Sequence, residues 1–577
     1  MALMTVASLL EMLSIGMVIP VVHAFTSSDG GGIPFLSKFD VALKQMPANL
    51  VLGVFAALFV VKNITLMFLL YAINSTMAHR TADLTEKLFD SYLERPLLFH
   101  LRANSADLIQ RLTAGTRISF DAMRHLLLIV LEALLTVTTI ALLLLVEPVT
   151  TLSLAAAMVV VTLVFYGVTA QRLREWGRHT LNGEALLLRW LNQAFFAIRD
   201  IKLSHSYAFL TRKVADTSHD IAANHSRGST VMQLPRLFLE VVMVVSLLVA
   251  VFVLKNSDRP NAEIVTILGL YGMAGLRLMP SLNRILSSVA ELRQRTAYVD
   301  TLYNDLRDGL FDRDRPPARP LGTASRQLTH EIRLEGVGFR YPGSEQEALA
   351  EISLTVSRGE SIGFVGPSGA GKSTVVDVLL GLIMPSDGRV TADGRDIRDD
   401  LESWQRRIGY VPQQVSLFDD TLRRNIAFGQ VDGDIDEARV LRALELARLD
   451  DVVASWPDGL DTILGERGAR MSGGQRQRVA IARALYCDPD LLVFDEATSA
   501  LDNETEREIT VAIEALAGSK TVLLIAHRLS TVRNCDRIVF MKEGRIKAVG
   551  AFDSLVAENP EFRHFAELGH FDLTQGA

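Results

Sequence analysis

The chain has 577 residues, too many for one hydrophobic core, so two or three domains are expected. Hydrophobic residues make up 49% of it, which is high for a soluble protein, and charged residues make up 22%. The net charge of −7 gives no reason to expect a nucleic acid as partner, and the two cysteines, Cys487 and Cys535, have no metal-ligand spacing and are expected to be free thiols.

Six apolar segments of about 20 residues, the length that an α-helix needs to cross a bilayer, lie in the first half of the chain. They fall near residues 2–24, 49–73, 125–146, 149–169, 235–254 and 262–284. The first has no basic segment before it and no small-residue cleavage site after it, so we predict a retained span rather than a signal peptide.

Two connections between these segments are long, at about 74–124 and 170–234, and both have helix-like patterning. Lys and Arg number seven in 77–124 and nine in 171–233, against two in "KNSDRPNA" and none in "EP". Because cytoplasmic loops are enriched in positive charge, both long connections and both termini are predicted to be cytoplasmic. Long helices should therefore protrude from the membrane.

A charged, proline-rich stretch at 306–328 is typical of an exposed linker between a membrane domain at 1–305 and a second domain at 329–577. In this second domain, strand-like runs such as "SIGFVG", "LLVFDEA" and "TVLLIAH" alternate with helical ones. The alternation predicts an α/β nucleotide-binding domain with a largely parallel sheet.

The stretch "FVGPSGAGKST" contains a phosphate-loop pattern between a predicted strand and a predicted helix. Its glycines let backbone N–H groups surround phosphate, Lys372 supplies positive charge to the β- and γ-phosphates, and the Ser373 hydroxyl can bind Mg²⁺. A Gly-rich turn without function is the alternative. The predicted ATP-binding residues of the loop are Gly366, Ser368, Gly369, Gly371, Lys372, Ser373 and Thr374.

Two carboxylates, Asp495 and Glu496, end the apolar run "LLVFDE", 122 residues after Ser373. A carboxylate at the end of a strand beside a phosphate loop is positioned to hold Mg²⁺, and its neighbour can polarise a water molecule. We assign Asp495 to the metal and Glu496 to the general base. The alternative is a solvated carboxylate pair.

Between these motifs, "RMSGGQRQRVAIARAL" resembles the signature of ATP-binding-cassette (ABC) proteins, with Met471 where Leu is usual. Further cassette motifs follow the same resemblance: the adenine-stacking aromatic in "FRYPG", the Q-loop glutamine in "YVPQQ", "GERG" at 465–468, "SALD" at 499–502 and the switch histidine in "IAHRLS". The resemblance implies roles in ATP binding and hydrolysis for Tyr341, Gln413, Ser472, Gly473, Gly474, Gln475 and His527, with Gln413 also a metal ligand.

In this family the signature of one cassette caps the phosphate loop of its partner, so one cassette and six spans imply a second copy of the chain, most simply a homodimer. Six spans followed by a cassette is the exporter arrangement. "GERG" is an exporter feature that contacts the intracellular loops, which makes Glu466 a relay candidate. Import is the weaker interpretation.

Several ionisable residues lie in the apolar segments, where each costs about 2.5–3.5 kcal/mol near a helix centre and therefore needs a partner or a cavity. Arg277 and Arg284 share one helix face, because seven residues turn through about 700°. Arg284 could reach the headgroups, and Arg277 could pair with Glu132 or Glu240. Alternatively, both arginines bind an anionic substrate through guanidinium–phosphate contacts.

The segments "LLEMLSIGMVIPVV", "LPRLFLE" and "LRLMPSLNRI" resemble PglK-type flippases, which move lipid-linked oligosaccharides across the bacterial inner membrane. This resemblance implies that basic residues of the cavity contact the pyrophosphate of the lipid. The predicted substrate-binding residues are Lys62, Arg236, Arg277 and Arg284.

The sequence thus predicts a homodimeric ABC exporter in the inner membrane, which uses ATP and Mg²⁺ to move an anionic lipid-linked oligosaccharide or related lipid to the outer leaflet. Two alternatives stay open: an exporter of lipid A, drugs or peptides, and an ATP-gated channel or regulatory subunit.

Overall fold

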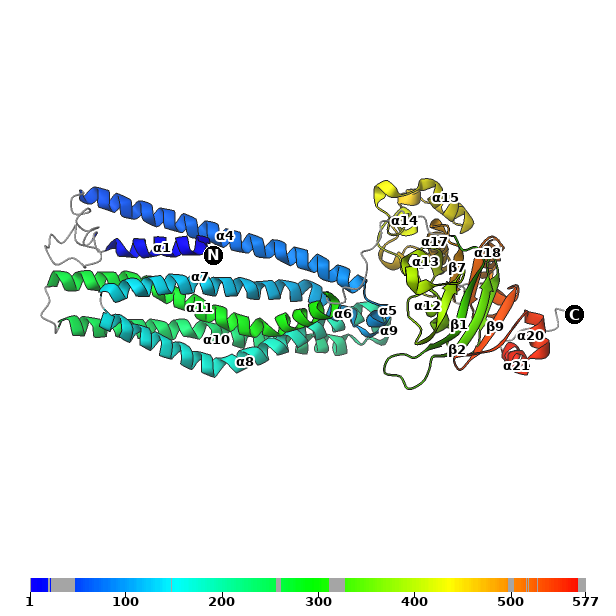
Figure 1. Cartoon of the computed structure of the whole chain (residues 1–577), viewed down its shortest axis with the longest axis horizontal. Coiled ribbons are helices and arrows are strands. Elements are labelled where there is room, and N and C mark those ends of the chain that lie inside the picture. The colour runs from blue at the N-terminus through cyan, green and yellow to red at the C-terminus, as the bar shows by residue number, and fades with distance from the viewer. Residues whose placement is uncertain are drawn as a thin grey trace. The chain divides into compact units, whose positions relative to one another are not determined.

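Figure 1 shows the computed structural model, which describes residues 2–18, 21, 47–146, 148–255, 261–310, 327–496, 503–514, 516, 518–526 and 528–568. The chain forms two compact units. One comprises Met1–Arg95 and Phe99–Pro316, and the other comprises Pro96–Leu98 and Pro317–Ala577.

The first unit is a bundle of long helices (Figure 1). Its elements are α1 (Ala2–Gly16), α4 (Ala48–Leu93), α5 (Leu97–Arg102), α6 (Ser105–Gln110), the π-helix η1 (Arg111–Gly115), α7 (Thr116–Val146), α8 (Pro148–Phe196), α9 (Ile198–Ser204), α10 (Tyr207–Lys255) and α11 (Asn261–Leu310). Each of the six apolar segments predicted to span the membrane has residues in one of the helices α1, α4, α7, α8, α10 and α11. The membrane-type helical fold is confirmed.

Among the described residues, four helical stretches are long and apolar enough to cross a bilayer: Asn49–Leu93, Ser105–Leu145, Thr151–Phe196 and Tyr207–Val245. The described part of α1 is 15 residues long, too short to meet the same criterion. Six crossings therefore stay a prediction.

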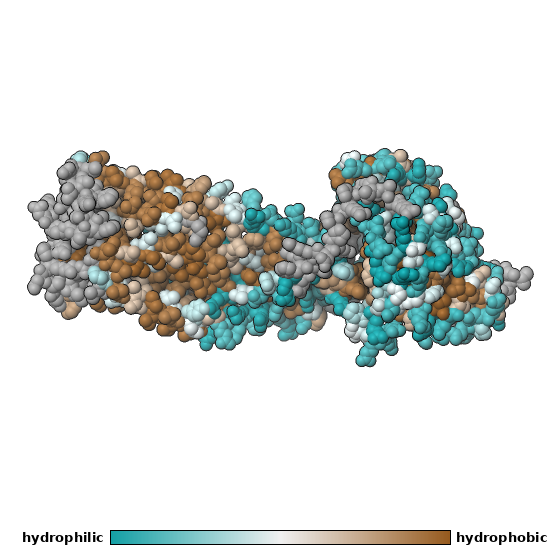
Figure 2. Space-filling view, in the orientation of Figure 1, coloured by the Kyte–Doolittle hydropathy of each residue, from teal (hydrophilic) through white to brown (hydrophobic). Residues whose placement is uncertain are grey.

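The apolar side chains gather along one part of the helical bundle, and the part that carries α5, α6 and α9 is polar (Figure 2). In the polar part, Arg189 of α8 binds Asp107 of α6 through two parallel contacts, with N···O distances of 2.9 and 2.5 Å. The polar end agrees with the prediction that the long connections form helices outside the lipid.

Asp305, near the end of α11, joins several of these polar helices. Its side chain is 11% exposed and accepts hydrogen bonds from the Tyr92 hydroxyl at 2.9 Å and from Arg111 Nη1 at 2.8 Å. Burial and the charge of Asp305 raise the pKa of Tyr92, so this hydroxyl remains a donor. Asp305 thereby ties α4 and the π-helix to the segment of α11 that leads into the predicted linker.

The second unit contains two sheets. The antiparallel sheet has the order β2 (Leu349–Ser357), β1 (Glu331–Phe339), β4 (Asp387–Ala392) and β5 (Arg395–Asp396). The other sheet has the order β10 (Arg545–Gly550), β9 (Arg537–Lys542), β3 (Ser361–Val365), β8 (Thr521–Ile525), β7 (Leu491–Asp495) and β6 (Ile408–Val411), and it is parallel apart from β10. The predicted parallel sheet is confirmed, and the antiparallel sheet is an addition to it.

The helices of this unit are α12 (Lys372–Leu379), α13 (Leu401–Gln405), α14 (Leu422–Ile426), α15 (Glu437–Leu446), α16 (Asp450–Ala454), α17 (Gly473–Tyr486), α18 (Asn503–Glu514), α19 (Leu529–Val532), α20 (Phe552–Glu558) and α21 (Pro560–Leu568), with short 3-10 turns at Ile397–Asp400, Asp432–Asp434, Gly459–Asp461 and Glu466–Gly468. Successive residues of the central strands enter two different cores, because strand side chains alternate between faces. In β7, Leu492 and Phe494 join the core that includes α17, whereas Leu491 and Val493 join the core that includes α12.

The helices α8 and α11 approach each other closely at Gly177. A Cβ atom on Gly177 would lie 1.9 Å from the backbone oxygen of Gln294, and backbone cannot rotate away as a flexible side chain can. Gly167, also on α8, has open space around its Cβ position.

Gly177→Ala should therefore force the two helices apart and destabilise the protein by about 1–3 kcal/mol, the usual cost of overpacking. We expect a lower thermal midpoint for the detergent-solubilised full chain. Gly167→Ala is the matched control and should not lower the midpoint. Equal midpoints for both variants would show that the α8–α11 contact adjusts without cost.

Candidate nucleotide and substrate sites

The loop between β3 and α12 has a backbone that only glycine tolerates at several positions. Gly366 and Gly371 have φ values of +148° and +94°, and a Cβ would lie 2.1 Å from the Met541 oxygen in the first case and 2.7 Å from the Ala348 oxygen in the second. Gly369 has φ +79°. The glycines thus allow the tight loop before α12, whose first N–H groups have no partners within the helix and are available to bind an anion.

Lys372 lies in the first turn of α12 and is 5% exposed. Its ammonium group donates to the carbonyl oxygens of Gly366 at 2.9 Å and Pro367 at 3.1 Å, so the loop holds its own lysine. Burial lowers the pKa of Lys372, and the charges of Glu496 and Asp495 oppose that shift. This arrangement keeps a positive charge within the phosphate loop.

The carboxyl ends of β3, β8 and β7 lie at one edge of the parallel sheet. Asp495 pairs with Ile525 of β8, and Phe364 of β3 pairs with the same Ile525. Two strand spacings, β7 to β8 and β8 to β3, therefore separate Asp495 from the strand that leads into the phosphate loop. This corresponds to about 10 Å across the sheet. This register explains why motifs far apart in sequence occupy one edge.

Glu496 follows Asp495 in a left-handed backbone conformation, with φ +49°. Its N–H donates to the Ile525 oxygen at 2.9 Å, and its Oε2 accepts from Gln413 Nε2 at 2.5 Å. Such a backbone is uncommon for a residue other than glycine and is held here by the neighbouring strand. The structure thus brings Gln413 and Glu496 together, as the assigned roles require.

Two further residues at this edge were missed from the sequence. The Tyr410 hydroxyl, on β6, donates to Asp495 Oδ2 at 3.2 Å, and burial and the charge of Asp495 raise the pKa of Tyr410. Burial and Asp495 also raise the pKa of Asp377, on α12, to about 6. The position of Tyr410 in "GYVPQQ", three residues before the Q-loop glutamine, was the available signal.

The predicted Mg²⁺ ligands offer oxygen atoms of the kind that this ion prefers: the Ser373 hydroxyl, the Gln413 amide oxygen and the Asp495 carboxylate. Within the described residues no group of three His, Cys, Asp or Glu side chains is placed to hold a metal, so the site depends on this mixed set. Gln413 uses its Nε2 toward Glu496, which leaves its amide oxygen as the ligand atom. The residues fit Mg²⁺.

The predicted adenine contact, Tyr341, follows β1 and packs edge-on against Phe339, with ring centroids 4.9 Å apart. Its hydroxyl lies 3.3 Å from Thr374 Oγ1 of α12. The structure therefore places Tyr341 beside the phosphate-loop helix.

The signature stretch begins helix α17. Ser472 is the N-cap: its Oγ accepts from the Gln475 N–H at 3.2 Å, and the Gln475 side chain accepts from the Ser472 N–H at 2.9 Å. This capping box fixes the first turn, where Gly473 and Gly474 add no side chains that would block an approaching phosphate.

Two predicted motifs lie outside the described residues: His527 and the "SALD" stretch at 499–502. His527 comes two residues after β8, the strand between β3 and β7. Glu466 is exposed, at the start of the 3-10 turn Glu466–Gly468.

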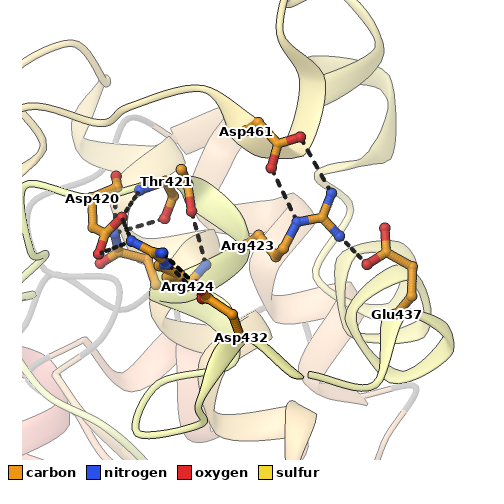
Figure 3. A network of polar contacts seen from close by, with 8 residues as sticks. Asp420, Thr421, Arg423, Arg424, Asp432, Glu437 and Asp461 are labelled. Atoms are coloured by element: carbon orange, nitrogen blue, oxygen red, sulfur yellow. Dashed lines mark hydrogen bonds and ion pairs between the residues drawn. The ribbon is translucent and has the colours of Figure 1, made fainter. Parts of the chain in front are cut away.

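A polar network surrounds the short helix α14 after the Q-loop (Figure 3). Arg423 binds Glu437 and Asp461, and Arg424 binds Asp420 and Asp432. Single exposed ion pairs stabilise little, but this network joins α14 to three neighbouring segments. Nearby, the ring centroids of Phe418 and Phe428 lie 5.0 Å apart, with the ring planes tilted by 34°, and the two residues are 57% and 50% exposed.

A second polar site lies inside the helical unit. Glu11 of α1 is 2% exposed, and its Oε1 is 3.2 Å from Lys62 Nζ of α4 and 2.9 Å from Arg277 Nε of α11. Glu132 of α7 lies 2.6 Å from Arg284 Nε through Oε1 and 3.8 Å from Arg277 Nη2 through Oε2. We call these five residues the ionic cluster.

The ionic cluster unites three of the four predicted substrate-binding residues. Arg277 and Arg284 both contact Glu132, as residues on one face of a helix can, and the alternative in which Arg277 pairs with Glu132 is observed. Glu11 is a further partner that the sequence did not indicate. Arg236 is exposed on α10, and among the described residues it makes no ion pair with the cluster.

A phosphate loop, a strand-end carboxylate pair and a helix-capping signature, joined to apolar helices, define an ATP-driven membrane transporter. The "ABC transporter" family model matches residues 349–499. A bacterial Atm1-family ABC exporter with ATP bound superimposes with a TM-score of 0.76 at 25% sequence identity, over 98% of each chain.

Curated relatives match most of the chain. The ATP-dependent lipid A-core flippase of Ralstonia nicotianae is 32% identical over 82% of this chain and 79% of its own length, and that of Thiobacillus denitrificans is 32% identical over 92% and 90%. The chain belongs to the ABC transporters, as an exporter half-transporter that hydrolyses ATP.

Glu496→Gln keeps the shape of the side chain and removes its basicity. We expect ATP hydrolysis to fall by about 10²–10⁴-fold, the usual contribution of a general base, with ATP affinity changed little. Hydrolysis and nucleotide binding by the purified full chain are the measurements. Glu445→Gln, at an exposed position of α15, is the control and should hydrolyse normally. Normal turnover in Glu496→Gln would refute the assignment of the base.

Tyr410→Phe removes the hydrogen bond to Asp495 and keeps the ring. Because partners of a ligating carboxylate tune metal binding, the Mg²⁺ concentration for half-maximal hydrolysis should rise by about tenfold. A titration with Mg²⁺ at saturating ATP tests this. Tyr486→Phe, whose hydroxyl accepts from the Asp436 N–H, is a matched control. An unchanged Mg²⁺ requirement in Tyr410→Phe would show that the bond has no part in metal binding.

Proposed function

We propose that two copies of this chain form an ATP-driven flippase for a phosphate-bearing amphipathic lipid in the bacterial inner membrane. The observation that carries this proposal is the ionic cluster. Three cations, Lys62, Arg277 and Arg284, face two carboxylates, Glu11 and Glu132, so within these five described residues the cations outnumber the carboxylates by one. An anionic headgroup would supply the missing negative charge.

Arg284 is the member of the cluster most open to a ligand. Its side chain is 47% exposed, and its ion pair with Glu132, the one it forms among the described residues, uses its Nε. The two Nη groups of a guanidinium form a fork that matches two oxygens of a phosphate. Arg277 and Lys62, which are more buried, would contribute charge behind it.

In the cassette, we assign the phosphates of ATP to the loop with Lys372 and the adenine to Tyr341. Ser373, Gln413 and Asp495 would hold Mg²⁺, which supplies charge neutralisation at the phosphates when bound. Glu496, held by Gln413, would accept a proton from water, and the family resemblance assigns His527 a role in the same hydrolysis.

The requirement for two chains follows from the signature. The N-terminus of α17 is a second phosphate site, and the proposal assigns it to the ATP held by the phosphate loop of the other copy. Closure of the cassettes would then move the helices.

The relatives named above direct the choice of cargo toward lipid A-core, a phosphorylated glycolipid that was one of the open alternatives. The lipid-linked oligosaccharide stays a prediction. Both lipids carry phosphate and acyl or prenyl chains, so the ionic cluster suits either. The proposed boundaries remain 1–305 for the membrane domain, 306–328 for the linker and 329–577 for the cassette.

A reconstituted assay separates these cargoes. The full chain in phosphatidylcholine nanodiscs should hydrolyse ATP faster when lipid A is added, and the double variant Arg277→Gln, Arg284→Gln should need at least about tenfold more lipid A for the same stimulation, since charge-assisted contacts are lost. Stimulation by a polyprenyl-pyrophosphate glycan, measured in parallel, tests the other lipid.

The double variant Arg172→Gln, Arg174→Gln carries the same change of charge on an exposed part of α8 and should respond as the unmodified protein does. Stimulation by neutral drugs alone, or by no lipid, would overturn the proposed cargo class. A particle of one chain, rather than two, in native mass measurements would overturn the homodimer.

A further inference from the structure

We propose that Glu132 is an internal substitute for the phosphate of the cargo. Its carboxylate occupies the guanidinium groups of Arg277 and Arg284 until an anionic headgroup displaces it, and it thereby sets how much anionic lipid is needed to start transport. This inference rests on the proposed function and adds a specificity-determining residue to the same site.

The position of Glu132 is the first argument. Its side chain is 6% exposed and lies between two arginines seven residues apart on α11, at 2.6 Å from Arg284 and 3.8 Å from Arg277. The Ser281 hydroxyl donates to its Oε2 at 2.7 Å. A carboxylate held in this way presents two oxygens and one negative charge to the arginines, as a small anion would.

A phosphate group is the stronger ligand for the same donors. A phosphomonoester carries about −1.5 to −2 charges at neutral pH and three acceptor oxygens, whereas a carboxylate carries one charge and two oxygens. Arg284 is half exposed, so a headgroup can reach it without opening the whole bundle. Displacement of Glu132 from this arginine therefore requires no new donor on the protein.

The other end of the ionic cluster is incompletely hydrogen-bonded. Glu11 Oε2 and Arg277 Nε are buried, and neither has a hydrogen-bond partner of suitable geometry among the described residues, although Arg277 Nε lies 2.9 Å from Glu11 Oε1. Buried polar atoms without partners cost free energy. The cluster is thus not at an optimum, and a rearrangement that brings another acceptor to Arg277 would improve it.

The backbone of α11 is also weakened between the two arginines. Pro280 lies inside the helix and has no N–H, so the helical hydrogen bond to the carbonyl four residues earlier is missing. Arg277 and Arg284 stand on either side of it. When a headgroup takes the place of Glu132, α11 can adjust at Pro280, and the contact of α11 with α7 loses its ion pairs.

Glu132→Gln tests the inference, because it keeps the size of the side chain and its capacity to accept from Ser281 but removes the charge. In phosphatidylcholine nanodiscs, the lipid A concentration for half-maximal stimulation of hydrolysis should fall by about tenfold relative to the unmodified chain. Glu132→Asp, which keeps the charge, should stay within about threefold of the unmodified value. Glu240→Gln, at an exposed site on α10, is the matched control and should match the unmodified chain.

If a substitution alters ATP hydrolysis itself, binding of labelled lipid A to the purified chain without ATP provides a second measurement. Ser281→Ala removes the hydrogen bond to Glu132 Oε2 and should lower the lipid A concentration for half-maximal stimulation by about threefold. A higher or unchanged requirement in Glu132→Gln would mean that Glu132 only supports the arginines, and it would overturn this inference. Failure of lipid A to stimulate the unmodified chain would instead overturn the proposed cargo.

Discussion

The cost of placing ionised side chains among apolar helices is the constraint on which the membrane half depends. Each such group costs about 2.5–3.5 kcal/mol near the centre of a span on insertion scales, so it must meet an opposite charge. Glu11, Lys62, Glu132, Arg277 and Arg284 come from four helices and satisfy this requirement together. The ionic cluster therefore links α1, α4, α7 and α11 within the apolar bundle.

A different constraint organises the cassette. Parallel strands end at one edge of their sheet, and the backbone groups beyond that edge are available to a ligand. Here β3 leads into the phosphate loop at that edge, and β7 ends there with Asp495, followed by Glu496. The strand between them, β8, ends there two residues before position 527. The glycine at 366 is required because a side chain there would strike the backbone of β9.

The two sites divide the work of an exporter. The cassette determines the energy source. Its residues would serve almost any cargo, so they do not indicate which cargo is moved. In the proposed function, the ionic cluster bears on the cargo, since its three cations and two carboxylates would favour an anion over a neutral molecule. Within the helical unit, Asp305 joins α4 and the π-helix to α11.

Much of the cassette could be predicted because its chemistry is local. A phosphate loop, a strand ending in two carboxylates and a capped signature helix each occupy a few consecutive residues, and the structure has the expected strands and helices at all three. Tyr410 lies close to the Q-loop motif in sequence, but its contact with Asp495 could not be predicted, because that contact depends on β6 pairing with β7 across 85 residues of sequence. The antiparallel sheet was likewise missed, because no short sequence motif marks which of its strands pair with each other.

The sequence by itself determined the order of the membrane helices and the cassette, and the shared face of Arg277 and Arg284, because hydropathy, short motifs and helical periodicity act over short distances. It also predicted the residues of the ATP site from such motifs. Only the tertiary structure decided which carboxylates face those arginines. Glu11 lies 266 positions before Arg277, and no local pattern links them. Ion pairs between helices depend on how the helices pack, and that packing placed two carboxylates beside the basic residues predicted to bind cargo.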